Sequence, residues 1–263
     1  MLTVSNVTKI FNPGTINEKV AINDLSITFH DGDFITVIGG NGAGKSTLMN
    51  LISGVYPIDA GSIQLNGKEI SRLPEHKRAK MLGRVFQDPM MGTAADMEIQ
   101  ENLALAYRRG RGRGLKWGIS HKEKELFKTQ LARLGLGLED RMTSKVGLLS
   151  GGQRQAITLL MATLQRPELL LLDEHTAALD PVTARKVLEL SEELISEAKL
   201  TTMMVTHNMK DAIAHGNRLI MMNAGKIIFD ISGVAKQRLT VDDLMHEFAK
   251  AGGEDLSDRA LLS

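Results

Sequence analysis

The residues best suited to chemistry in this sequence lie between positions 39 and 47, where a glycine-rich turn ends in Lys45 and two hydroxyl residues. The order Gly, four residues, then Gly-Lys-Ser/Thr is the pattern of a phosphate-binding loop. Glycines let backbone N–H groups curl around phosphate oxygens, Lys45 adds a positive charge, and the Ser46 hydroxyl is placed to ligate Mg²⁺. The sequence therefore predicts that the chain binds a nucleoside triphosphate. The candidate binding residues in this loop are Gly39, Asn41, Gly42, Ala43, Gly44, Lys45, Ser46 and Thr47.

A second group of candidate residues follows two apolar runs later in the chain. Residues 169–172 are all Leu and are expected to form a strand buried on both faces of a parallel sheet. Asp173 and Glu174 come next, at the edge where ligands bind in open α/β sheets. We assign Asp173 to Mg²⁺ and Glu174 to the general base that orients and deprotonates the attacking water. His207 ends the next apolar run at the same expected edge and is a further catalytic candidate.

A third candidate site is the turn Leu149–Gln153, which reads Leu-Ser-Gly-Gly-Gln. Ser150 is a natural N-cap, the two glycines let a phosphate approach the backbone, and the helix that follows points its positive end at this place. A plain helix start is the alternative for such a turn. The candidate phosphate contacts are Ser150, Gly151, Gly152 and Gln153.

The elements that must position these residues follow from the periodicity of the chain. Alternating apolar and polar residues predict an antiparallel flap formed by residues 2–8, 21–29 and 61–67. Phe11, at the end of the first strand of this flap, could stack on a nucleotide base, with a core position as the alternative. Buried strands are predicted at 33–38 and 201–206, a helix at 46–53, a hairpin at 218–230 and a helix at 240–251. Amphipathic helices at 98–108, 122–134 and 152–165 predict a helical insertion at about 88–165.

Composition limits the class of protein further. The chain has 263 residues with 43% hydrophobic content, which is enough for a sizeable core. The 32 basic and 31 acidic residues nearly cancel, so no polyanion partner is implied and we expect no nucleic-acid binding. There is no cysteine, and no uncharged apolar run approaches the ~18 residues of a membrane helix. We therefore expect that the chain does not itself cross a bilayer.

Together these motifs resemble the ATP-binding cassette (ABC) family of transport ATPases over about residues 1–235, with residues 236–263 as a terminal helix and tail. The resemblance implies an α/β fold: a P-loop NTPase core with a mostly parallel sheet, an N-terminal antiparallel β subdomain and an inserted helical subdomain. It also implies that Gln87 is the Q-loop glutamine, a catalytic and Mg²⁺ residue, and that Asp180 belongs to the nucleotide-contacting D-loop. Phe11 stands in this resemblance at the aromatic A-loop position, and His207 is the switch histidine.

The resemblance further implies ATP as ligand, Mg²⁺ as cofactor, and ADP and phosphate as products. It implies a head-to-tail dimer with a second copy, in which ATP lies between the phosphate loop of one chain and the signature turn 149–153 of the other. Permease subunits in the membrane and an extracytoplasmic substrate-binding protein are the implied partners, which places the chain at the cytoplasmic face of the membrane. An importer ATPase is the leading interpretation. The alternatives are an exporter subunit and a soluble, non-transport ABC ATPase.

Some residues depart from the simple pattern. His175 stands where most of the family has Pro, and is interpreted as a tolerated turn residue or as a specific contact near the D-loop. Residues 108–116 form a basic, glycine-rich loop, either solvated or in contact with anionic lipid. Met90 and Met91 are either contacts for a permease helix or core residues. The stretch 173–180, with the basic loop, resembles an importer subgroup often assigned to tryptophan or tyrosine uptake.

Overall fold

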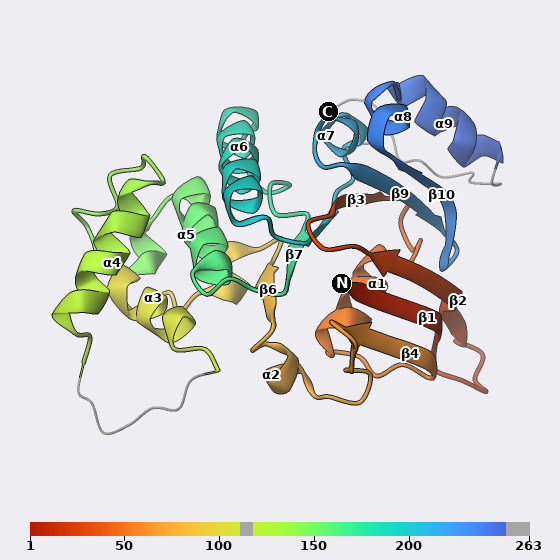
Figure 1. Cartoon of the computed structure of the whole chain (residues 1–263), viewed down its shortest axis with the longest axis horizontal. Helices are drawn as coiled ribbons and strands as arrows, with labels where there is room; N and C mark the ends of the chain where they lie inside the picture. The colour runs from red at the N-terminus through yellow and green to blue at the C-terminus, as the bar shows by residue number, and fades with distance from the viewer. Residues whose placement is uncertain (111–117, 251–263) are drawn as a thin grey trace. The chain divides into compact units, whose positions relative to one another are not determined.

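The computed structural model describes residues 1–110 and 118–250, and the chain forms two compact units. The first unit holds residues 1–78 and the chain from residue 199 onward, and the second holds residues 79–198 (Figure 1). The phosphate loop and His207 belong to the first unit, whereas the signature turn and the carboxylates belong to the second.

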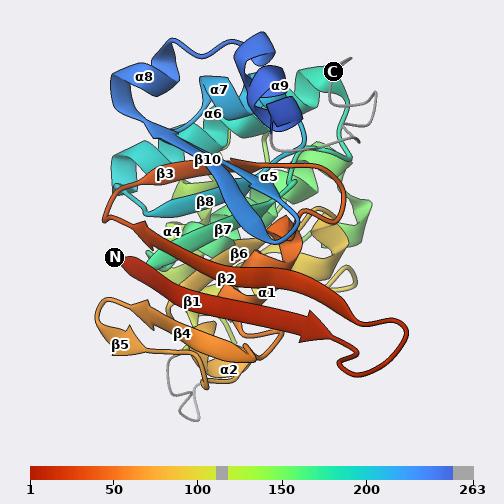
Figure 2. The same ribbon diagram turned by 90° about the vertical axis from the view of Figure 1, so that its right-hand side faces the viewer.

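One sheet of the first unit is antiparallel, with the strand order β2-β1-β4-β5 (Figure 2). Its strands are β1 (Leu2–Phe11), β2 (Lys19–Phe29), β4 (Ala60–Leu65) and β5 (Lys68–Glu69). The turn from β4 to β5 is Asn66-Gly67, with φ of 50° and 75°. Positive φ at both residues is what a two-residue hairpin turn demands, which is why Asn-Gly is favoured there. The predicted antiparallel flap is thus present.

The other strands of the first unit place the phosphate loop. They are β3 (Phe34–Ile38), β8 (Thr202–Val205), β9 (Arg218–Asn223) and β10 (Lys226–Ser232). β3 pairs in parallel with both β8 and β9, and β10 runs antiparallel to β9. Every residue of β3 and β8 is buried. Because Val37 is paired with Val205 in this parallel ladder, the phosphate loop after β3 and His207 after β8 leave the same edge of the sheet.

The helices of the first unit are α1 (Lys45–Ser53), α2 (Glu75–Arg78), α7 (Met209–Ala214), α8 (Gly233–Gln237) and α9 (Val241–Lys250). The sequence predicted α1 and α9 but not the three short helices, and the predicted tail beyond residue 250 lies outside the described residues. Lys236 of α8 is buried, and its Nζ donates to the carbonyls of Ile213, His215 and Gly216 at 2.7, 2.6 and 3.1 Å. A cation at these carbonyls stabilises the C-terminal end of α7.

The second unit combines a pair of parallel strands with helices. Strands β6 (Leu82–Val85) and β7 (Leu169–Asp173) pair with Leu82 opposite Leu169. The helices are α3 (Ile99–Tyr107), α4 (His121–Ala132), α5 (Gly151–Thr163) and α6 (Pro181–Ala198), with 3-10 turns η1 (Pro89–Gly92) and η2 (Val146–Leu148). Leu103, Phe127 and Ile157 pack in one buried cluster contributed by α3, α4 and α5. The sequence predicted these three helices within two residues of their ends, but it did not predict α6.

The start of the basic loop differs from both interpretations offered for it. The Arg108 guanidinium donates to the Glu123 carboxylate at 3.0 and 2.9 Å and to the Gly118 carbonyl at 2.8 Å. Arg109 is partly buried, and this burial lowers its pKa. These two arginines therefore serve the packing of the second unit, because their side chains are taken up by neighbouring elements. Residues 111–117, the rest of the loop, lie outside the described residues.

Candidate functional site

The phosphate loop has a backbone that only glycine can adopt at two of its positions. Gly39 has φ of 151°, and a Cβ there would lie 2.2 Å from the Met222 carbonyl oxygen. Gly44 has φ of 102°, and a Cβ there would lie 2.7 Å from the Ala21 carbonyl oxygen. Both values are far inside van der Waals contact, so the close approach of β9 and β2 fixes glycine at these sites.

The start of α1 is arranged as an anion site. Gly44 is its N-cap, and no described side chain caps this helix end. Helix N-termini of this kind bind anions through backbone N–H groups, and the helix dipole favours negative charge at the same place. Lys45 is buried, and its Nζ donates to the carbonyls of Gly39 and Gly40 at 2.6 and 3.1 Å. Ser46 is exposed, so its side chain is accessible to a ligand.

Phe11 lies at the end of β1 and is only partly buried. Its ring meets the Tyr56 ring edge to face, with centroids 5.3 Å apart at 82°, and the Lys9 Nζ lies 5.5 Å from its centroid. Tyr56 is itself exposed and was not a candidate at the sequence level. The signal in the sequence that could have identified Tyr56 was an aromatic residue shortly after the helix that follows the phosphate loop. This ring pair offers an accessible apolar surface on which a base could stack.

His207 follows β8 and is exposed, and it directly precedes Asn208, the N-cap residue of α7. The Asn208 side chain caps α7 by accepting from the amides of Lys210 and Asp211 at 2.9 and 3.1 Å. Burial raises the pKa of Asp211, and this effect is opposed by the charges of His215, His207 and Lys210. The helix cap thus fixes the backbone beside His207.

In the second unit, β7 carries four buried leucines and ends at Asp173. The Arg84 guanidinium of the paired strand β6 donates to Asp173 Oδ2 at 3.3 Å and lies 4.6 Å from the centroid of the Phe86 ring. Sequence reasoning missed Arg84, although an arginine inside a buried strand is a signal of a specific partner. Glu174 follows with φ of 44°, in the left-handed region. A non-glycine residue in that conformation is uncommon and gathers at functional sites.

Gln87 is exposed two residues beyond the end of β6, and the turn after it is ordered by Asp88. The Asp88 carboxylate accepts from the Met90 amide at 2.8 Å and caps the 3-10 turn η1. Met90 and Met91 are 41% and 71% exposed, so the interpretation of these two methionines as core residues is wrong.

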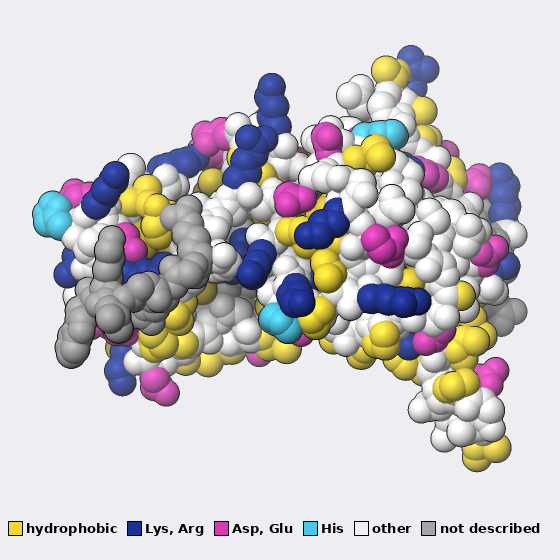
Figure 3. Space-filling view, turned by 60° about the horizontal axis from the view of Figure 1, so that its bottom comes forward, with side chains coloured by type: hydrophobic (Ala, Val, Ile, Leu, Met, Phe, Trp, Pro, Cys, Tyr) yellow, Lys and Arg dark blue, Asp and Glu magenta, His cyan; other side chains and the backbone are white. Residues whose placement is uncertain are grey.

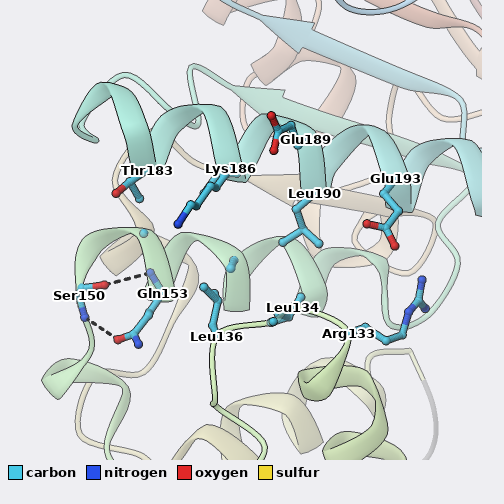
Figure 4. Close-up of a pocket in the computed structure, with 14 residues that line it drawn as sticks. Arg133, Leu134, Leu136, Ser150, Gln153, Thr183, Lys186, Glu189, Leu190 and Glu193 are labelled. Atoms are coloured by element: carbon cyan, nitrogen blue, oxygen red, sulfur yellow. Dashed lines mark hydrogen bonds between the residues drawn. The ribbon is translucent and has the colours of Figure 1, made fainter.

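The signature turn is a capped helix start. The Ser150 hydroxyl accepts from the Gln153 amide at 3.3 Å, and the Gln153 side chain accepts from the Ser150 amide at 3.2 Å (Figure 4). Gly152 is buried, and a Cβ there would lie 2.1 Å from the Thr183 Cγ2 of α6. Packing of α5 on α6 therefore requires this glycine, whereas Gly151 is exposed.

A cavity of about 500 Å³ lies beside this turn, between α5, α6 and the segment after α4. At one end Lys186 extends from α6 toward the start of α5, where Ser150, Gln153 and Thr183 supply polar groups (Figure 4). The other end is lined by Leu134, Leu136 and Leu190, with the charged side chains of Arg133 and Glu193 beside them (Figure 4). The polar end of the cavity belongs to the signature site.

His175 lies near the start and Asp180 at the end of the turn that joins β7 to α6. Asp180 is exposed and caps α6 by accepting from the Thr183 amide at 3.1 Å, and hydrogen bonds from Thr183 hold the pKa of its carboxyl below the usual value. His175 is buried, and its Nε2 lies 3.1 Å from the Ser191 Oγ of α6. This defined partner favours the interpretation of His175 as a specific contact.

The sequence of this chain is similar to that of known proteins. Residues 22–177 match the family model described as "ABC transporter". The chain belongs to the ABC transporter family. A "Tyrosine transport ATP-binding protein" of Clostridioides difficile is 44% identical over 95% of this chain and 100% of its own length. A "Methionine import ATP-binding protein" of Bartonella henselae is 30% identical over 95% of this chain and 74% of its own length.

Solved structures agree with this assignment. A dimeric ATP-binding cassette in a post-hydrolysis state, with ADP and Pi bound, matches with a TM-score of 0.75 and 26% identity over 88% of this chain and 98% of its own. The ABC ATPase fold predicted from sequence is confirmed, and with it an α/β P-loop core that binds ATP. This ABC protein is an ATPase that powers transport. Within residues 1–110 and 118–250, no helix has both the length and the apolar character of a membrane span.

Proposed function

We propose that this ABC ATPase drives a bacterial importer of amino acids, with an aromatic amino acid such as tyrosine as cargo. The observation that carries this proposal is the 44% identity to a tyrosine transport ATP-binding protein over that protein's whole length. The methionine relative is named for import, which favours uptake over export. We place the ATPase domain at residues 1–235, with its helical insertion at about 88–165 and a terminal helix and tail at 236–263.

The residue roles follow from the chemistry of the two units. The phosphate-loop amides and Lys45 hold the triphosphate, and Phe11 stacks on the base. Glu174 deprotonates the attacking water, and His207 orients the γ-phosphate. Ser46, Gln87 and Asp173 offer hydroxyl, amide and carboxylate oxygens, which are the ligands that Mg²⁺ prefers. When bound there, Mg²⁺ neutralises charge on the phosphates.

The assembly we propose is a head-to-tail dimer beneath two permease subunits at the cytoplasmic face of the membrane, fed by an extracytoplasmic substrate-binding protein. The dimeric cassette among the similar structures supports the dimer. In the dimer that we propose, the nucleotide bound by one chain is contacted by five residues of the other chain: Ser150, Gly151, Gly152, Gln153 and Asp180. The exposed Met90 and Met91 supply an adaptable apolar surface for a permease helix.

Replacement of the base tests the chemistry. We expect Glu174→Gln to lower steady-state phosphate release by roughly 10²–10⁴ while nucleotide affinity stays at the parent value, since removal of a general base spares ground-state binding. ATP should then hold two chains together, which light scattering would detect as an ATP-dependent dimer. Lys45→Ala is the matched control, because it should weaken ATP binding itself. Parent-rate hydrolysis by Glu174→Gln would remove Glu174 from this role.

A further inference from the structure

His175 directly follows the candidate base, and it is buried although it lies in a turn. Its exposed fraction is 2%, and its partner Ser191 in the middle of α6 is 1% exposed. Burial of an imidazole is costly unless its polar atoms are hydrogen-bonded, so the 3.1 Å approach of Nε2 to Ser191 Oγ is a specific contact.

The direction of this hydrogen bond follows from the second bond of Ser191. Its Oγ donates to the Val187 carbonyl at 2.7 Å, which is the shorter of the two contacts. A hydroxyl has a single hydrogen, and with that hydrogen given to Val187, Oγ can only accept from His175. The hydrogen-bond network therefore assigns a hydrogen to Nε2, and His175 is the donor.

The turn from Glu174 to Asp180 is attached to α6 at two places. At its far end, Asp180 caps the first turn of the helix through Thr183. At its near end, His175 reaches Ser191, ten positions after the first residue of α6. Between them, the Glu174 carbonyl accepts from the Ala177 amide at 3.0 Å. Glu174 has φ of 44°, a conformation that is unfavourable for a residue with a side chain and persists only when its surroundings hold it.

We propose that His175 is a positioning residue for Glu174. Its bond to Ser191 holds the turn in the left-handed conformation from which the Glu174 carboxylate is directed, and His175 itself touches no substrate. The inference rests on the proposed role of Glu174 as base. Through the contact of His175 with Ser191, α6 supports Glu174 as well as Asp180.

The test is ATP hydrolysis by the purified full-length protein carrying His175→Leu or Ser191→Ala. We expect each to lower kcat by about ten- to hundredfold with KM for ATP unchanged, since a small misplacement of a catalytic group costs rate rather than binding. His175→Gln keeps a donor near the Nε2 position and Ser191→Thr keeps the hydroxyl, so both should recover most of the rate. The double variant His175→Leu/Ser191→Ala should be no slower than either single variant.

A second arm separates positioning from simple structural support. When His175→Leu is added to Glu174→Gln, the residual rate should not fall further, because there is no base left to position. An equal loss in that background, or a parent kcat in both single variants, would overturn the inference. Should His175→Leu fail to fold in a thermal unfolding control, Ser191→Ala and its Thr counterpart decide the question. Parent-rate hydrolysis by Glu174→Gln alone would instead remove Glu174 from the proposed role of base, on which this inference rests.

Discussion

The two glycine-rich helix starts of this ABC ATPase are built in opposite ways. At α1, no described side chain caps the helix, and Gly44 stands at the N-cap in a left-handed conformation. At α5, Ser150 and Gln153 cap each other's amides in a capping box. The first site therefore offers backbone N–H donors to a ligand, whereas the second has already used part of its backbone donors within the protein.

The difference indicates what each site can give to a phosphate. The phosphate loop binds with its main chain, so its shape depends on glycines that tolerate the approach of β2 and β9. At the signature turn, the Ser150 oxygen accepts from Gln153, which leaves the hydroxyl hydrogen to be donated outward. The phosphate loop thus binds phosphate with backbone amides, whereas the signature turn offers the Ser150 hydroxyl at a helix end that is already capped. Substitutions can test this contrast at both sites.

The largest effect should come from Gly44→Ala. Its left-handed backbone would cost about 1–2 kcal/mol, and overpacking against Ala21 and Ile22 would add about 1–3 kcal/mol. Gly42→Ala is the matched control, because its φ is also positive but the nearest atom to a Cβ there is the flexible Lys19 Nζ at 3.5 Å. Urea unfolding should show a clearly larger loss for Gly44→Ala. Equal losses would mean that backbone conformation alone, and not the approach of β2, fixes this glycine.

A smaller effect is expected for Gly152→Ala, which places a methyl group against Thr183. Overpacking should destabilise the protein by about 1–3 kcal/mol, and Thr183→Ser should restore most of it by removing the Cγ2 atom. Gly151→Ala, whose Cβ would meet only the end of the Leu179 side chain, is the control. If Thr183→Ser brings no recovery, the packing of α5 on α6 is not the reason for this glycine.

The smallest change in stability is expected at Ser150, where two substitutions can distinguish its role as a helix cap from its role as a phosphate contact. Ser150→Ala should lose about 1 kcal/mol, whereas Ser150→Asp keeps a capping oxygen and should stay within about 0.5 kcal/mol of the parent. The aspartate has no hydrogen to donate and repels phosphate, so it should abolish the ATP-dependent dimer in a Glu174→Gln background. Light scattering together with urea unfolding measures both. A dimer formed normally by Ser150→Asp would show that the hydroxyl hydrogen is not needed.

Much of the fold could be predicted because its signals are local. The buried runs at β3 and β7, the Asn-Gly turn at residues 66–67 and the periodic helices of the second unit each carry their pattern within a few residues. The helix α6 was missed, although Asp180 and Pro181 are typical of a helix start. The short helices α2, α7 and α8 hold too few residues for a period to be visible.

The candidate site divides in the same way. Motif residues such as Lys45 and Glu174 could be named from spacing, but their partners could not, because packing brings those together across many residues of sequence. Arg84 meets Asp173 across 89 positions, and His175 meets Ser191 only because α6 runs beside the turn. The role of Gly152 was read as access for phosphate, and the structure adds a contact with Thr183 that no local pattern reveals.

The ammonium of Lys236, enclosed by carbonyls at the end of α7, has a consequence for chemical labelling. An amine reacts with acylating reagents only when it is deprotonated and accessible, and this one is neither exposed nor free of its acceptors. In the native protein, Lys236 should therefore be acylated far more slowly than exposed lysines such as Lys226. Its modification would accordingly report the opening of α8 from α7, the helix that begins beside His207.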